Sequence, residues 1–107
     1  MLLFFFRNPE STLAFQIGEC AQILSGGLLL ATPHAVMGAN VTGVTRCSFA
    51  VFMEPGHLYK MQIPEGATLK QTTHTKNLPP NVPPLEKRFD CNPDTTFGSF
   101  SEKTIAE

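Results

Sequence analysis

Apolar and polar residues alternate along much of the chain, and this pattern predicts β-strands more than helices. The clearest case is the segment 46–53, in which one face carries Cys47, Phe49, Val51 and Met53 and the other carries Arg46, Ser48, Ala50 and Phe52. The segment 58–63 alternates again, and the apolar runs at 12–17, 21–24 and 28–36 also favour strands. Turn signals at 25–27 and 55–56 separate them, and Pro33 restricts the third run to an edge or bulged strand.

The sequence after residue 67 is polar and rich in proline. Five of the nine prolines lie between Pro79 and Pro93, which favours an extended surface loop over 68–98 rather than a recruitment motif. Ser99 and Glu102 have the spacing of a capping box, with Ser99 as the N-cap. A short helix is therefore expected over 99–107, while the segment 1–11 receives no structural assignment.

Together these elements predict an all-β fold, a sandwich or jelly-roll sheet followed by the proline-rich loop and the short helix. Strands with apolar residues on both faces require a second sheet, which the rest of the chain does not supply. The pattern therefore also predicts open strand edges and marginal stability.

Composition and charge exclude several classes of function. Charged residues make up 16% of the chain and the net charge is -1, so neither nucleic acid nor an anionic membrane is an expected partner. No apolar run approaches a membrane span, and the run at 2–6 is shorter than the apolar region of a signal peptide. The three cysteines, Cys20, Cys47 and Cys91, form no C-x-x-C pair. We expect reduced thiols and a cytoplasmic location.

The three histidines differ in their surroundings. His57 follows a Pro-Gly turn and His74 lies in a polar stretch, so both are expected to be solvated. His34 lies in the apolar stretch 31–36. Taken alone, it is interpreted more simply as a hydrogen-bonded core histidine than as a ligand.

Arg46 and Ser48 form a candidate anion site. They are two residues apart on one predicted strand, so their side chains project from the same face. A guanidinium and a hydroxyl placed in this way can bind one carboxylate. The simpler alternative is a surface ion pair between Arg46 and either Glu54 or Glu19.

Residues 13–55 resemble the C-terminal half of the catalytic barrel of Fe(II)- and 2-oxoglutarate-dependent oxygenases, in their isopenicillin N synthase-like branch. The resemblance is carried by Gly26-Gly27, the sequence Ala31-Thr32-Pro33-His34-Ala35-Val36, the loop to Gly43 and the pair Arg46-x-Ser48. Phe97-Gly98-x-Phe100-Ser101 is also similar to the tail segment of plant and microbial members. The resemblance implies a double-stranded β-helix, a form of jelly roll, of which residues 12–67 supply part.

The resemblance also implies a role for each matching residue. His34 falls on the distal iron ligand, and Arg46 and Ser48 on the pair that grips the far carboxylate of 2-oxoglutarate. The complete enzymes decarboxylate 2-oxoglutarate to succinate and CO₂ and oxidise a small-molecule substrate. No residue of this chain is assigned a further catalytic role.

One part of the family pattern is missing. The iron site of these enzymes needs two histidines and one carboxylate, and the family supplies two of these as His-x-Asp or His-x-Glu. None of His34, His57 and His74 is followed by an acidic residue at that spacing. The chain is therefore expected to be a C-terminal fragment that binds neither Fe(II) nor 2-oxoglutarate stably and is inactive alone.

Two alternatives remain open from the sequence. In the first, the chain is a small non-catalytic β-sandwich that binds a ligand or a partner. In the second, the chain barely folds by itself. In the first case exposed strand edges recruit another protein or a second copy by strand addition.

Overall fold

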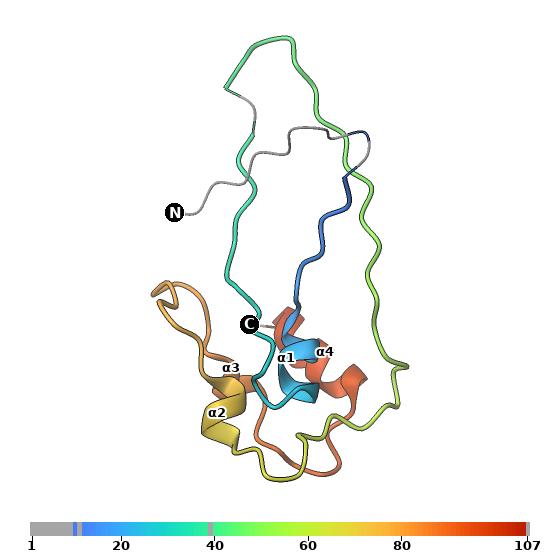
Figure 1. Ribbon diagram of the computed structural model, residues 1–107, viewed down its shortest axis with the longest axis vertical. Coiled ribbons are helices and arrows are strands. Elements are labelled where there is room, and N and C mark those ends of the chain that lie inside the picture. Colours follow the sequence, from blue (N-terminus) through green and yellow to red (C-terminus); the bar gives the residue numbers. More distant parts are fainter. Residues whose placement is uncertain (1–9, 11, 39, 107) are drawn as a thin grey trace.

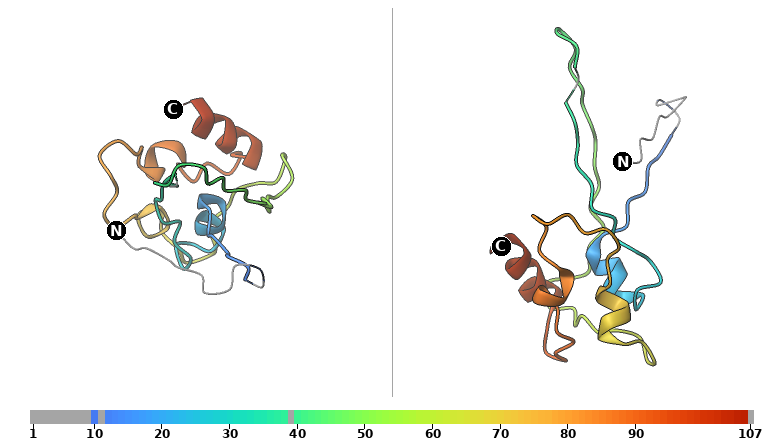
Figure 2. Two further views of the ribbon diagram at one scale, coloured as in Figure 1. Left: turned by 90° about the horizontal axis from the view of Figure 1, so that it is seen from above. Right: turned by 90° about the vertical axis from the view of Figure 1, so that its left-hand side faces the viewer.

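The computed structural model describes residues 10, 12–38 and 40–106, and it divides them into a helical body and long extended segments. Figure 1 shows the helices gathered at one end, with the segments 12–17, 28–38 and 44–57 leading away from them in the same direction. The views in Figure 2 show the same division. The radius of gyration is 16.3 Å, whereas a compact chain of this length has about 13 Å.

The helical body contains four short helices. They are α1 (Glu19–Leu24), α2 (Leu69–Thr73), α3 (Leu85–Arg88) and α4 (Phe97–Ala106). The helices come from both sides of the extended segments, so the body brings together residues that are far apart in the chain (Figure 1).

The prediction of an all-β fold is wrong. In the ranges that the structure describes, the only β-pairing is an isolated antiparallel bridge between Lys60 and Thr96. The segments predicted as strands at 12–17, 28–36 and 46–53 are extended, but they form no ladder (Figure 1). A strand becomes part of a sheet only when a neighbour supplies the complementary N–H and C=O groups. No jelly roll is present, because no described segment provides them.

The segment 21–24, predicted as a strand, belongs to helix α1. Cys20, Ile23 and Leu24 have spacings of three and four residues, which place them on one face of a helix. The helix ends in a Schellman motif, in which Gly26 N–H donates to Ile23 O and Gly27 N–H donates to Gln22 O, both at 2.9 Å. The Gly-Gly pair therefore forms a turn, as predicted, but the turn ends a helix rather than a strand.

Gly27 is the point at which the end of α1 meets α2. Its φ is 84°, and a Cβ there would lie 2.5 Å from the Gln71 carbonyl oxygen. We expect Gly27→Ala to lower the free energy of unfolding by about 2 kcal/mol, because it adds a backbone clash to the strain of a positive φ.

Gly43 provides the matched control for this substitution in urea unfolding. Its φ is 80°, but a Cβ there meets nothing within 4 Å. Gly43→Ala should therefore cost only about 1 kcal/mol of local strain. Equal losses for the two variants would contradict the close approach of α1 and α2.

The proline-rich stretch 68–98 is not the continuous loop that the sequence predicts, because it contains α2 and α3. In α2, the Thr68 hydroxyl accepts a hydrogen bond from Gln71 N–H at 3.2 Å and caps the helix. Helix α3 begins directly after Pro84, a position where proline does not disturb a helix. Leu85 and Phe89, four residues apart, are both buried.

Helix α4 begins two residues before the predicted start. Its capping pair is Thr96 and Ser99: Ser99 N–H donates to Thr96 Oγ1 at 3.2 Å, and Thr96 N–H donates to Ser99 Oγ at 3.0 Å. Ser99 is thus the third residue of the helix and not its N-cap, as the sequence had indicated.

The hydrophobic core lies between the helices and is small. It consists of Ile23, Met61, Leu85, Phe89 and Phe100. The rings of Phe89 and Phe100 meet edge to face, with centroids 6.3 Å apart and planes at 90°. Because the core draws on α1, α3, α4 and the segment after the extended arms, it depends on contacts across the whole chain.

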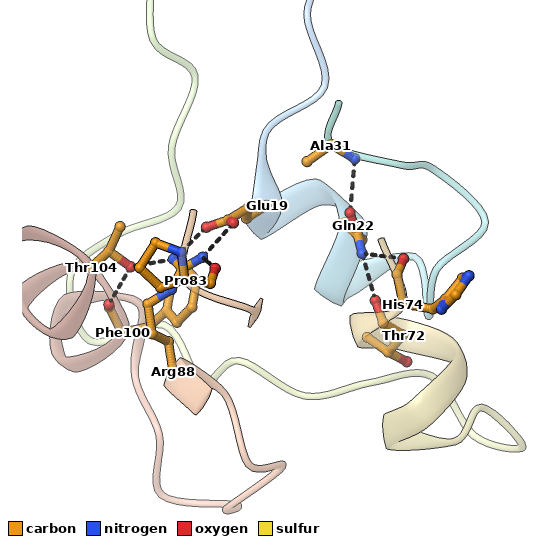
Figure 3. Close-up of polar contacts among 9 residues, drawn as sticks. All are labelled: Glu19, Gln22, Ala31, Thr72, His74, Pro83, Arg88, Phe100 and Thr104. Carbon is orange, nitrogen blue, oxygen red and sulfur yellow. Dashed lines mark hydrogen bonds and ion pairs between the residues drawn. The ribbon is translucent and has the colours of Figure 1, made fainter. Parts of the chain in front are cut away.

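Two buried polar side chains tie the helices together (Figure 3). Arg88 donates to both carboxylate oxygens of Glu19 at 2.6 Å and to Thr104 Oγ1 at 3.0 Å. Gln22 donates to Thr72 O and accepts from Ala31 N–H, both at 2.8 Å. Charge-assisted, bidentate hydrogen bonds of the first kind are the strong ones. These contacts link α1 to α2, α3 and α4.

Candidate functional site

The three predicted site residues lie on the extended segments, outside the helical body. His34 belongs to the segment 28–38, and Arg46 and Ser48 belong to the segment 44–57; all three side chains are exposed. Figure 1 shows the segments 28–38 and 44–57 as separate extended stretches of the chain, and among the described residues no backbone hydrogen bond joins the two segments. Arg46 and Ser48 therefore lie near each other because they are two residues apart in the chain, whereas the structure does not bring His34 into contact with them.

His34 is not the buried core histidine that its apolar surroundings favour. Its ring is exposed, and its Nδ1 lies 3.1 Å from Thr32 O, a hydrogen bond within its own segment. Its Nε2 is accordingly left to solvent. An exposed imidazole of this kind is available to a ligand that approaches from outside the chain.

Arg46 has no acidic partner among the residues that the structure describes. Glu19, one of the two partners considered from the sequence, is bound to Arg88 instead. Glu54, the other, lies on the same segment and makes no ion pair with Arg46. The guanidinium therefore retains its full set of N–H donors for an external anion.

Arg46 and Ser48 together can bind one carboxylate. In an extended segment, residues two positions apart project from the same face and lie about 7 Å apart along the chain. The guanidinium fork matches the two oxygens of a carboxylate, and a serine hydroxyl can donate one further hydrogen bond. Because both side chains are exposed, water competes strongly for these donors, and the binding they support is weak.

The described residues do not fit a catalytic iron. Such a site needs two histidines and a carboxylate around one ion, and no group of three potential ligands is found in the ranges described. The carbonyl of His57 accepts from Gly98 N–H of α4 at 2.8 Å, and His74 ends α2. Each histidine thus lies on a different element. The role of His34 as an iron ligand stays a prediction, and such a site would need a second histidine and a carboxylate from elsewhere.

Two cavities in the described part of the chain lie away from the candidate anion site. One of about 190 Å³ lies between residues 30–33 and 74–76. Another, of about 390 Å³, is lined by residues 80–84 and Lys87. Neither is lined by His34, Arg46 or Ser48. The anion site is therefore an open surface site that encloses none of its ligand.

The cysteine thiols are free, and two of them are held protonated. Burial and then the nearby Glu54 raise the pKa of Cys20. Burial and then Asp90 raise the pKa of Cys91. Since the thiolate is the reactive form, neither is an activated nucleophile at neutral pH. Cys47 is exposed on the same segment as Arg46.

No protein-family model, curated protein or solved structure matches the chain. Across the described part of the chain, every helix falls short of the length and hydropathy of a membrane span.

Proposed function

We propose that this chain supplies the 2-oxoglutarate-binding end of an Fe(II)- and 2-oxoglutarate-dependent dioxygenase and has no oxygenase activity by itself. The observation that carries the proposal is the free guanidinium of Arg46. Arg46 is the only Asp, Glu, Lys or Arg between Glu19 and Glu54, and it has Ser48 two residues further along an extended segment.

A dicarboxylic 2-oxo acid suits this arrangement. One carboxylate would take the guanidinium fork of Arg46 and the hydroxyl of Ser48. The opposite end of the molecule would extend away from the segment, and the described residues there supply no second cation. With only one end held by exposed groups, we expect a dissociation constant of about 1 mM or weaker.

The proposal leaves oxygen chemistry to residues outside the segments described. His34 offers one imidazole, and a facial triad requires another histidine and a carboxylate. The small-molecule substrate that such an enzyme oxidises would likewise be recognised by other parts of the complete protein. The free thiols of Cys20, Cys47 and Cys91 suit a reducing compartment, and we place the protein in the cytoplasm.

Replacing Arg46 tests the proposal. We expect Arg46→Ala to weaken binding of 2-oxoglutarate at least about tenfold, because a bidentate charge-assisted contact is lost. Ser48→Ala should weaken it by about threefold, the loss of one hydrogen bond to a charged group at an exposed site. Binding is followed by the amide chemical shifts of ¹⁵N-labelled protein, at a concentration at which the chain is monomeric.

Lys76→Ala is the matched control, because it removes an exposed cation from another part of the chain. It should leave the 2-oxoglutarate titration unchanged. If Arg46→Ala and Lys76→Ala weaken binding equally, the anion is attracted by charge in general and the proposal is wrong. Adding Fe(II) to the wild-type titration should yield no succinate; metal-dependent succinate would contradict the inactivity of the chain.

The structure changes the form of the alternative function. A β-sandwich binding module is excluded by the absence of a sheet in the described ranges. A non-catalytic role in protein association remains, and a specific observation favours it: the segment 44–57 carries large apolar side chains that are exposed.

A further inference from the structure

The segment 46–54 exposes several large apolar side chains. Its most exposed large side chains are Phe49 (94%), Met53 (91%), Phe52 (84%) and Val51 (72%). The accessible surface of the whole chain is 9132 Å², about 3,200 Å² more than a compact monomer of this mass exposes. All the extended segments contribute to this excess, and segment 46–54 supplies part of it; a standard stable interface buries about 1,600 Å² from both partners together.

The backbone of this segment is also unpaired. In the described chain, residues 44–55 take part in no backbone–backbone hydrogen bond. Residues 46–54 contain neither proline nor glycine and include Phe49, Val51 and Phe52, residue types that favour strands. The neighbouring segment 28–38 is interrupted by Pro33, which cannot donate to a ladder. Of these two segments, 46–54 is therefore the better template for strand addition.

We propose that two copies of the chain associate through this segment, as antiparallel strands related by a twofold axis at Ala50. In that register, residue 50+n of one copy lies opposite residue 50−n of the other. The pairs across the axis are Phe49 with Val51 and Cys47 with Met53, both apolar, on one face, and Ser48 with Phe52 on the other. Opposed residues share a face, so each pair is in contact.

Charge complementarity selects a second copy as the occupant. The segment begins at Arg46 and ends at Glu54, and each is four residues from Ala50. The twofold register therefore places Arg46 of each copy opposite Glu54 of the other, which gives one ion pair at each end of the ladder. If the pairing register between the two copies is shifted by two residues, both ion pairs are lost. The isologous contact closes on itself, as a dimer interface must.

A charge exchange tests this register. Arg46→Glu alone places two acidic residues opposite each other at both ends of the ladder, and Glu54→Arg alone places two basic residues there. We expect each single variant to raise the dimer dissociation constant at least about tenfold. The double variant Arg46→Glu/Glu54→Arg should restore the wild-type value. Light scattering coupled to size-exclusion chromatography over a wide concentration range measures all four proteins.

Val51→Lys provides a second test within the ladder, and Phe15→Lys its matched control on the exposed segment 12–17. Val51→Lys should give a monomer whose helical circular dichroism is unchanged, and Phe15→Lys should dimerise as wild type. A wild-type chain that is monomeric throughout, or oligomers that the single charge variants do not weaken, would overturn the proposal. So would a double variant that is not restored.

This dimer and the 2-oxoglutarate site share Arg46, so dimerisation competes with anion binding, and two variants separate the proposals. The double charge variant restores the dimer but has no arginine at position 46, so it should not bind 2-oxoglutarate. Ser48→Ala weakens the anion site and leaves the ladder intact, since alanine fits opposite Phe52. Loss of one property therefore identifies which of the two proposals is wrong.

Discussion

Glu19→Gln is expected to destabilise the helical body by about 2 kcal/mol, because it leaves the charge of Arg88 buried and unmatched. The Arg88 side chain is only 5% exposed, whereas that of Glu19 is 33% exposed. Full burial of both partners would make the loss larger, and the partial exposure of Glu19 reduces it. The measurement is urea unfolding followed by circular dichroism.

Arg88→Met should cost less than Glu19→Gln, although it removes the same ion pair. Methionine is uncharged and so leaves no buried charge, and the remaining Glu19, which is 33% exposed, can be hydrated. Glu86→Gln, which neutralises an exposed carboxylate on α3, is the control and should change stability by less than about 0.5 kcal/mol. If Glu19→Gln behaves like Glu86→Gln, the ion pair does not hold the helices together.

Phe89→Ala should have the largest effect of any single substitution, with a loss of about 3–5 kcal/mol. Phe89 is fully buried and packs edge to face against Phe100. The core contains few other large side chains to fill the space. Since small domains have only about 5 kcal/mol of stability or a little more, we expect this variant to be largely unfolded.

Phe15→Ala is the matched control, because its ring is 88% exposed. It should leave the free energy of unfolding unchanged within about 0.5 kcal/mol. Both variants are compared by the dispersion of amide resonances and by urea unfolding. A folded Phe89→Ala variant with wild-type stability would show that the helical body is not the structural core of this chain.

The sequence located the extended segments but not their pairing. Alternation over 46–53 reports that the backbone is extended there, and the structure agrees (Figure 1). A sheet also requires a neighbour with complementary hydrogen-bonding groups, and alternation within one segment contains no information about that neighbour. The same limitation explains why the all-β prediction failed although the segments 12–17 and 46–53 are extended (Figure 1); the predicted strand 21–24 is helical.

The missed helices did carry a local signal. Leu85 and Phe89 are four residues apart, as are Cys20 and Leu24, and both spacings are helical. These helices have only four and six residues, so each shows barely one turn of the period. Such short elements are stabilised by tertiary packing rather than by propensity. The prolines near α3 and the Gly-Gly pair after α1 also favour loops and turns between strands.

The candidate site was predicted in part. The proximity of Arg46 and Ser48 follows from extended geometry and needs no tertiary information. The pairing of Glu19 with Arg88, 69 residues away, does not follow from any local pattern. Because Glu19 is paired with Arg88, it is not available to Arg46 as the surface ion-pair partner that the sequence suggests. The exposure of His34 was likewise hidden, because an apolar run predicts burial only when another element covers it.

The most direct test of the central claim is a titration of the monomeric, ¹⁵N-labelled chain with 2-oxoglutarate. We expect amide shifts to change around Arg46 and Ser48 while the helical body is unaffected, and we expect Arg46→Ala to weaken the binding at least about tenfold. Shifts centred on another part of the chain, or binding that Arg46→Ala leaves undiminished, would contradict the proposed site.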